Sequence, residues 1–149
     1  MKIYIACDHR GCELKKHLIE NLENAYEIIS SSLPNSSEDD YPDFAFDICT
    51  KMDKAKDLGI LICGTGIGIS IAANKVKGIR CARINNLDDA KSARIHNHAN
   101  VIAIPASLEK NVALEIIKTF LDTLPSNEER HVRRINKIIN YEEGSYNEL

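Results

Sequence analysis

The residues best suited to chemistry lie where an apolar run meets a group of glycines. Residues 58–75 read LGILICGTGIGISIAANK, and Cys63 is the last residue of the apolar run. Three alternating glycines follow it: Gly64, Gly66 and Gly68. Glycines let the backbone approach a ligand closely, and successive N–H groups that lead into a helix form an anion site. The stretch therefore predicts a site for an oxyanion or a phosphate.

These glycines fit two common nucleotide-binding motifs poorly. A dinucleotide fingerprint requires G-x-G-x-x-G, and here Ile69 stands where the third glycine belongs. The strand expected over 79–84 is not followed by the acidic residue that binds a ribose. A Walker loop requires G-x-x-x-x-G-K followed by Ser or Thr, which is absent. Both nucleotide-binding interpretations are therefore weak.

Cys63 has two possible roles. Free cysteines are among the most buried residues, so a core position is the first interpretation for each of the five in this chain. Cys63 differs because it precedes a glycine turn and a helix N-terminus, where N–H groups favour the thiolate. Thr65 could add a hydrogen bond to the sulfur. From position alone, a reactive Cys63 and a buried one remain equally open.

Other polar residues also stand at the ends of predicted elements. Asp8 and His9 follow the first apolar run, where the carboxylate could set the tautomer of the imidazole. His96 and Asn97 lie just before the run at 100–105, which is the amino end of a strand and the wrong rim for a site with Cys63. Arg130 and Arg134 are four apart and share a helix face. That pair is either a solvated basic face or an anion clamp.

The composition is that of one compact domain of 149 residues, 44% hydrophobic and 28% charged. A formal net charge of −3 argues against a nucleic-acid binder. No apolar run reaches the length of a membrane span, and the first is too short for a signal peptide, so we expect a cytoplasmic protein. The odd number of cysteines, without Cys-x-x-Cys, predicts free thiols and no structural zinc.

Short apolar runs alternate with helical patterns along the chain. We predict strands over 2–6, 26–30, 58–63, 79–84 and 100–105. We predict helices over 11–25, from about Pro42, and over 68–76, 86–97 with Asn86 as its cap, 107–124 and 127–143. This alternation indicates one Rossmann-like, three-layer α/β/α domain over residues 1–149, with a five-stranded parallel sheet and an extra C-terminal helix. Ligands of such sheets bind at the carboxyl ends of the strands.

Five segments match one family in its own order. They are ACDHRGCELKKHL at 6–18, DYPDFA at 40–45, GILICGTGIGISIAANKVKGIR at 59–80, IHNHANVIAI at 95–104 and RHVRRI at 130–135. On these segments the chain resembles the type B ribose-5-phosphate isomerases, a family that also holds the galactose-6-phosphate isomerase subunits. The Cys-Gly-Thr-Gly-x-Gly-x-Ser block is the most specific of the matches.

The resemblance implies an aldose–ketose isomerase that works without a metal or other cofactor. It would interconvert D-ribose 5-phosphate and D-ribulose 5-phosphate through an enediolate, in the pentose phosphate pathway. The family assembles as a homodimer, or a tetramer, with active sites at the subunit interface. We therefore expect His96 and Asn97 to enter the site of a partner subunit.

The resemblance also implies a role for each matching residue. Three act on the reacting atoms, with Cys63 as the base, Thr65 polarising it and His96 as the acid that opens the furanose ring. The others bind substrate: the loop amides of Gly64, Gly66, Ile67 and Gly68 hold the enediolate, Asp8, His9, Tyr41 and Asn97 contact the sugar, and Arg130 and Arg134 bind the phosphate.

One position departs from the family pattern. An arginine that helps to bind phosphate usually follows the strand expected over 100–105, and here Ser107 stands in that place. Losing one charge-assisted contact weakens binding by roughly 1.5–3 kcal/mol if nothing replaces it. Arg10, where the family has a small residue, or Lys110 could compensate.

Three alternative functions remain. An isomerase of a six-carbon sugar phosphate, such as allose or galactose 6-phosphate, would differ in pocket depth. A non-catalytic sugar-phosphate-binding module would not need both Cys63 and His96. A thiol redox protein would normally carry a resolving cysteine in a Cys-x-x-Cys motif.

Overall fold

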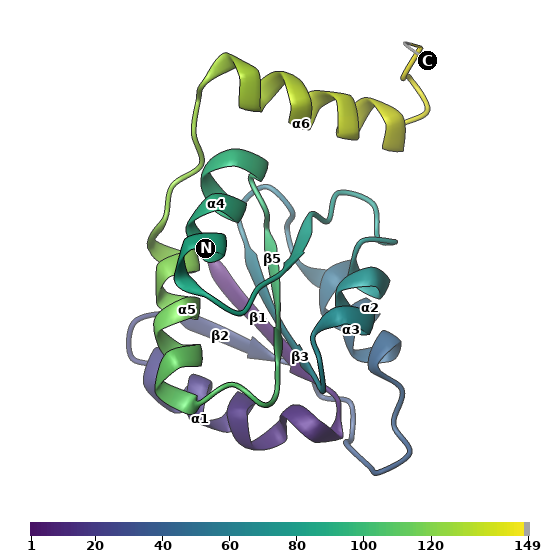
Figure 1. Cartoon of the computed structure of the whole chain (residues 1–149). Helices are drawn as coiled ribbons and strands as arrows, with labels where there is room; N and C mark the ends of the chain where they lie inside the picture. Colours follow the sequence, from purple (N-terminus) through teal and green to yellow (C-terminus); the bar gives the residue numbers. More distant parts are fainter. Residues whose placement is uncertain (148–149) are drawn as a thin grey trace.

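Five parallel strands form a single sheet in the computed structural model, which describes residues 1–147 (Figure 1). The strands are β1 (Lys2–Cys7), β2 (Glu27–Ser30), β3 (Leu58–Cys63), β4 (Cys81–Arg83) and β5 (Val101–Pro105). Their order across the sheet is β2-β1-β3-β5-β4, so β3 lies at the centre and β2 and β4 form the edges. The predicted fold class and the positions of all five strands are confirmed, although β2 and β4 are shorter than expected.

Within the described residues, one 3-10 turn and six α-helices connect and flank the strands. They are η1 (His9–Gly11), α1 (Cys12–Leu22), α2 (Tyr41–Lys51), α3 (Ile67–Ala73), α4 (Leu87–Asn97), α5 (Lys110–Asp122) and α6 (Glu129–Glu142). Pro42 lies in the first turn of α2, and the Asn86 side chain caps α4 by accepting the N–H of Asp89 at 2.8 Å, both as predicted.

Local hydrogen bonds make several helices shorter than the sequence pattern indicated. Helix α1 ends at Leu22 because the carbonyl of that residue accepts the N–H groups of both Ala25 and Tyr26, which turns the chain into β2. Helix α5 begins only at Lys110 because the carboxylate of Glu109 caps its first free N–H groups at 3.0 Å. Periodicity does not register such capping contacts.

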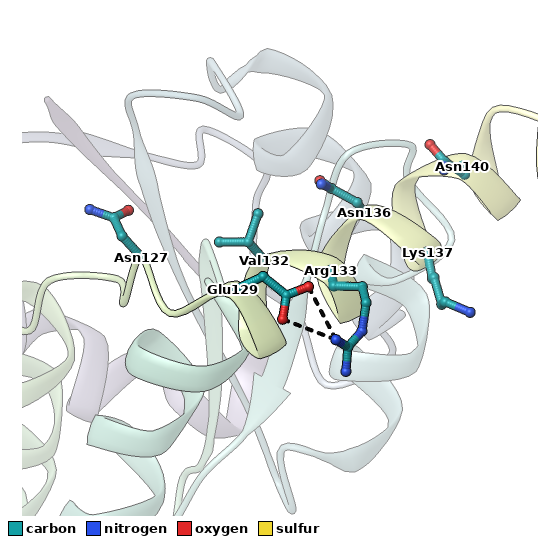
Figure 2. A pocket seen from close by; sticks show the side chains of 7 residues that line it. All are labelled: Asn127, Glu129, Val132, Arg133, Asn136, Lys137 and Asn140. Atoms are coloured by element: carbon teal, nitrogen blue, oxygen red, sulfur yellow. Dashed lines mark hydrogen bonds and ion pairs between the residues drawn. The ribbon is translucent and has the colours of Figure 1, made fainter.

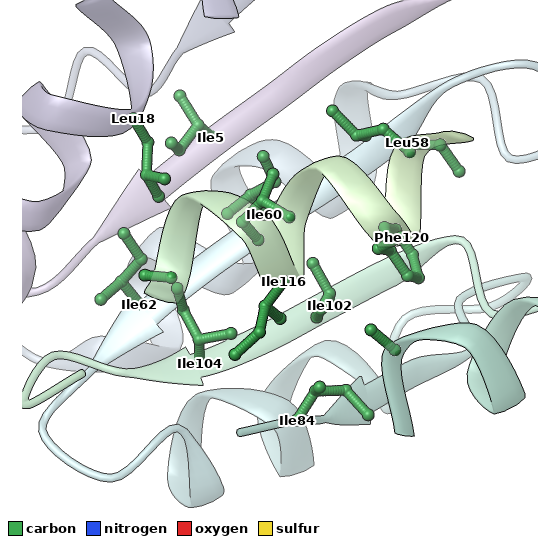
Figure 3. Packing of buried hydrophobic residues seen from close by; sticks show 14 of the residues in the cluster. Ile5, Leu18, Leu58, Ile60, Ile62, Ile84, Ile102, Ile104, Ile116 and Phe120 are labelled. Carbon is green, nitrogen blue, oxygen red and sulfur yellow. The ribbon is translucent and has the colours of Figure 1, made fainter. Parts of the chain in front are cut away.

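The helices cover both faces of the sheet and create two apolar cores. Helices α1, α4 and α5 pack on one face, where Ile60, Ile102 and Phe120 are fully buried (Figure 3). Helices α2 and α3 pack on the other face, around residues such as Phe44 and Ile69. Every residue of β3 is buried, as expected for a central strand of a parallel sheet covered on both sides.

Helix α6 lies outside these two layers. It crosses the end of the molecule opposite the turn between β3 and α3 (Figure 1). Only His131 and Ile135 of this helix are buried, whereas Ile138 and Tyr141 are exposed. None of the helices within residues 1–147 is long and apolar enough to cross a membrane.

Candidate active site

The turn after β3 holds Cys63 against a backbone N–H group. Cys63 is the last residue of β3 and is 4% exposed, and its Sγ accepts the N–H of Gly66 at 3.2 Å. This contact requires Gly66 to adopt the left-handed conformation, with φ of 73°. A Cβ at Gly66 would lie 3.0 Å from the carbonyl carbon of Ile104, so a side chain there would collide with the backbone of β5. The turn therefore needs glycine for conformation and for space.

Thr65 does not make the contact that the sequence suggested. Its hydroxyl accepts the N–H of Ile67 at 3.2 Å, and among residues 1–147 its side chain makes no hydrogen bond to Cys63. The reason is the tightness of the turn, which brings the Gly66 N–H to the sulfur instead. The carbonyl of Thr65 accepts Nε of Arg83 at 3.0 Å, a contact from β4 that the sequence did not indicate. Thr65 thus fixes the shape of the turn.

The first turn of α3 continues this set of backbone donors. Ile67 and Gly68 open the helix, and the first N–H groups of any helix have no carbonyl partner within it. The ring of Tyr41 lies directly over Gly68, where a Cβ would be 2.6 Å from Tyr41 Cζ. Tyr41 therefore borders the amide-rich turn and keeps 40% of its surface exposed.

Asp8 and His9 lie beside the same turn because β1 pairs with β3. The N–H of Asp8 donates to the carbonyl of Ile62 at 3.1 Å, which extends the ladder to the rim. Asp8 is 6% exposed, and its carboxylate accepts the N–H of Arg10 at 3.0 Å. The imidazole predicted to pair with Asp8 pairs instead with Asp39, at 2.6 Å between Nδ1 and Oδ1.

Asp39 is a site residue that the sequence did not reveal. Burial opposes its ionisation, yet hydrogen bonds from the Asn35 side chain, the His9 ring and the N–H groups of His9 and Ser36 lower its pKa to about 2. A permanently ionised Asp39 orients His9 and favours the tautomer or charged form with a proton on Nδ1. Residues 31–40 form a polar loop without periodicity, so no pattern pointed to this carboxylate.

Arg10 completes the border of the Cys63 turn. Its side chain lies against Gly64, where a Cβ would be 3.0 Å from Arg10 Cδ and 3.5 Å from Nη1. Lys110, the other cation considered as a replacement for the missing arginine, pairs with Glu13 at 3.8 Å. Ser107 is exposed in the loop that follows β5. That loop begins beside Cys63, whose carbonyl accepts the N–H of Ala106 at 2.8 Å.

His96 and Asn97 lie at the opposite rim of the sheet. They end α4, which leads into the amino end of β5, whereas Cys63 pairs with Pro105 at the carboxyl end of that strand. The length of β5 alone separates the two rims by about 13 Å at 3.3 Å per residue. Within one chain the structure therefore does not bring His96 and Cys63 together, as the sequence order predicted.

Both arginines of the predicted clamp lie on α6 at this second rim. Nε of Arg130 pairs with Glu128 at 2.8 Å, and Arg134 follows one turn later and is exposed. Between them, the buried ring of His131 packs on the ring of His96, with centroids 4.6 Å apart. Burial, together with the charges of Arg130 and Arg134, lowers the pKa of His131 despite the nearby Glu128, so this ring is neutral at pH 7.

Two hollows flank α6. One of about 610 Å³ runs along the helix beside the ion pair of Glu129 and Arg133, which are one turn apart (Figure 2). The other, about 760 Å³, is a groove between β4, α4 and α6, whose lining includes Arg83 and Asn97. Through Arg83 the groove reaches the Cys63 turn, and through Asn97 it reaches the second rim.

Three of the other cysteines have thiols whose pKa is raised by burial, Cys7 and Cys49 in the core and Cys81 partly buried at the edge of the groove. Burial raises the pKa of Cys7 and of Cys49 to about 12, and it raises the pKa of Cys81 as well. These thiols stay protonated at neutral pH and cannot serve as bases. All five cysteines are free, as predicted. Among residues 1–147, no group of three or more His, Cys, Asp or Glu side chains is arranged to hold a metal ion.

Comparison with known proteins covers nearly the whole chain. A family model described as Ribose/Galactose Isomerase matches residues 3–138. The probable ribose-5-phosphate isomerase B of Mycoplasma genitalium is 46% identical over 146 residues, 94% of this chain and 95% of that protein. Ribose-5-phosphate isomerase B of Mycobacterium tuberculosis is 39% identical over 146 residues, 95% of this chain and 90% of that one.

Solved structures give the same likeness in three dimensions. The M. genitalium ribose-5-phosphate isomerase B, crystallised with bound ribulose-5-phosphate, has a TM-score of 0.89 and 41% identity, covering 95% of this chain and 96% of that one. The enzyme from Clostridium thermocellum also has a TM-score of 0.89, with 39% identity over 97% of this chain and 99% of that one.

Proposed function

Because the chain belongs to the ribose/galactose isomerase family, we propose that it interconverts ribose 5-phosphate and ribulose 5-phosphate in the cytoplasm, as a step of the pentose phosphate pathway. The observation that carries this proposal is the Cys63 sulfur at the carboxyl end of the central strand, accepting a backbone N–H within an amide-rich turn. Such a turn suits a reaction that develops negative charge on oxygen beside a carbon that loses its proton.

In the proposed reaction, Cys63 acts as the base. The thiolate takes the proton from C2 of the open-chain aldose, and the electrons of that bond move into the carbonyl to give an enediolate. The same proton then returns to C1, and the hydroxyl proton on the C2 oxygen is transferred to the C1 oxygen, so that the carbonyl of the ketose forms at C2. A base of this kind typically contributes 10²–10⁴-fold to the rate.

The backbone of the turn stabilises the enediolate in this scheme. The N–H groups of Gly64 and Gly68 lie in or next to the turn that carries the base, while the Ile67 N–H donates to the Thr65 hydroxyl and Gly66 keeps the sulfur oriented. One such donor is typically worth about 3–4 kcal/mol at the transition state. Thr65 contributes by holding the Ile67 N–H and, through its carbonyl, Arg83.

The second half of the site would come from another copy of the chain. Furanose ring opening needs an acid, and the proposed acid, His96, lies at the wrong rim of its own subunit. In a homodimer, or in a tetramer built from such dimers, His96 and Asn97 of one subunit would face Cys63, Asp8, His9 and Tyr41 of the other. Arg130 and Arg134, on the helix that packs beside His96, would hold the phosphate.

Turnover of a panel of five- and six-carbon sugar phosphates tests the proposal, with a chelator present throughout. We expect ribose 5-phosphate to be the best substrate, with or without the chelator. Cys63→Ala should lower kcat by 10²-fold or more, in line with the loss of a general base, while the melting temperature stays near that of the wild type.

Cys12→Ala is the matched control for loss of a thiol, because Cys12 is half-buried at the start of α1 and its sulfur contacts the Asp8 carbonyl at 3.7 Å and the Cys7 thiol. A strong preference for allose or galactose 6-phosphate would transfer the proposal to a six-carbon substrate. Tight binding without turnover of any sugar phosphate would instead make the protein a binding module.

A further inference from the structure

Arg10 is held against the turn that carries the proposed base. It follows β1 directly, in η1, and its backbone N–H is fixed by the Asp8 carboxylate at 3.0 Å. Its aliphatic stem covers Gly64, with Cδ and Nη1 at 3.0 and 3.5 Å from the position of a Gly64 Cβ. Because Gly64 has no side chain, the Arg10 side chain can lie directly against the backbone next to Cys63. The guanidinium therefore borders the site.

Among residues 1–147, the guanidinium of Arg10 differs from the neighbouring cationic groups in having no hydrogen-bond or ion-pair partner. The His9 ring pairs with Asp39, Nε of Arg83 donates to the Thr65 carbonyl, and the Lys110 ammonium lies 3.8 Å from Glu13. Within residues 1–147, no carboxylate, carbonyl or aromatic ring is paired with the Arg10 guanidinium. Its charge and its donors are available to a ligand.

A permanently charged planar fork with free donors matches a phosphate. Guanidinium groups bind phosphate oxygens in pairs of parallel hydrogen bonds and do not lose their charge at any working pH. In a sugar phosphate the phosphate carries its charge in substrate, intermediate and product alike, whereas the enediolate charge is transient. The backbone N–H groups of the turn are suited to the transient charge of the enediolate. Arg10 is suited to the permanent charge of the phosphate.

We propose that Arg10 is a substrate-binding residue that contacts the phosphate group from the side of Cys63. This inference rests on the proposed function. Arg130 and Arg134 lie on α6 at the other rim, so they would reach the same phosphate from a second copy of the chain. The phosphate would then bridge cations of two subunits, and Arg10 would be the contribution of the subunit that supplies the base.

The test is Arg10→Met, which keeps an aliphatic stem over Gly64 and removes the charge. Lys110→Met is the matched control, since it removes a cation from the same rim whose partner is Glu13. We expect Arg10→Met to raise KM for ribose 5-phosphate about 10-fold or more and to leave kcat within about 2-fold. Competitive inhibition by inorganic phosphate should weaken by a similar factor. Lys110→Met should change none of these values.

Several results would overturn the assignment. An unchanged KM and unchanged phosphate inhibition in Arg10→Met would remove Arg10 from the phosphate site. A fall in kcat at constant KM would assign it to the reacting carbons instead. The same KM effect in Lys110→Met would show a general loss of positive potential.

Failure of the proposed function would look different, because the wild type itself would not turn over ribose 5-phosphate. Binding of inorganic phosphate, measured calorimetrically, still tests Arg10 in that case. Wild type and Arg10→Met should then differ about 10-fold in affinity, and equal affinities would reject the inference.

Discussion

The orientation of His9 depends on one carboxylate from another part of the chain. Asp39 accepts hydrogen bonds from the backbone and the ring of His9 and from two groups of its own loop. These contacts favour its ionised form, so its pKa is about 2 despite burial. The stability that Asp39 adds is complete above the ordinary carboxyl pKa of 3.8 and is lost only as the pH falls toward 2. At every pH suited to catalysis, His9 thus has an anionic partner.

Asp39→Asn should therefore weaken both the fold and the site. An amide cannot accept all four hydrogen bonds, so we expect the free energy of unfolding to fall by about 1–3 kcal/mol in urea denaturation. The released His9 should raise KM for ribose 5-phosphate. Asp40→Asn is the control, because the exposed Asp40 makes no capping hydrogen bond, and it should change stability by no more than about 0.5 kcal/mol. Equal effects of the two substitutions would contradict the role of Asp39.

At this scale the sequence pointed to polar residues at strand ends more readily than to the groups that orient them. Cys63, Asp8 and His9 follow strands, and that position is readable because ligands of a parallel sheet meet the carboxyl ends. Asp39 and Arg83 were not predicted, because each contacts the site through a loop or an edge strand whose path is set by packing. The Thr65 contact was predicted wrongly, since the tightness of a turn is a matter of backbone angles.

The β3–α3 connection is the element on which the proposed chemistry depends. Its left-handed glycine packs against β5, so the position of the Gly66 N–H is fixed by the neighbouring strand. The backbone of the turn is therefore held against β5, next to the end of the ladder that pairs β3 with β5.

Alanine substitutions at two glycines with the same backbone conformation distinguish the cost of a left-handed backbone from the cost of a steric collision. Gly66 and Gly144 have φ of 73° and 74°, and a Cβ at Gly144 would meet no atom within 4 Å. Both Ala variants incur the left-handed penalty, about 1–2 kcal/mol. Gly66→Ala should cost about 1–3 kcal/mol more, from collision with Ile104, and should also lower kcat. Equal unfolding free energies for the two variants, with unchanged kcat, would show that β5 does not constrain the turn.

Elements were predicted well wherever burial imposes a pattern. The run at 58–63 matches β3 at both ends because every one of its residues is buried. Helix boundaries shifted by several residues where a side chain or a carbonyl captured free N–H groups, as Glu109 and Leu22 do. Such capping hydrogen bonds involve one or two atoms and do not affect the hydrophobic periodicity of the sequence.

At the scale of the whole molecule, the two halves of the proposed site lie on opposite rims. Cys63 and His96 cannot meet within one subunit, because the length of β5 separates them. The sequence indicated this only through the order of elements, because a single chain carries no direct record of its partner. The groove between β4, α4 and α6 connects the two rims and offers exposed apolar side chains such as Ile138 and Tyr141.

Mixed subunits test this arrangement directly. Cys63→Ala and His96→Ala subunits, each inactive alone, should regain about a quarter of wild-type activity when mixed equally, since half the dimers are mixed and one of their two sites is intact. Mixing Cys63→Ala with Cys63→Ser, which damage the same half, should restore nothing. Assembled mixtures of the first kind without activity would mean that each site is built from one chain.

The strand order also has a consequence for how the chain folds. Every pairing in the sheet is parallel, and even the pairing closest in sequence joins Cys81 to Val101, while Ile3 must find Leu58. Loop closure must precede each of these contacts, so sheets of this kind form slowly compared with helical bundles. During synthesis β1 has only the edge strand β2 as a partner until β3 leaves the ribosome. The apolar N-terminal strand is therefore the segment most in need of protection while the polypeptide is still growing.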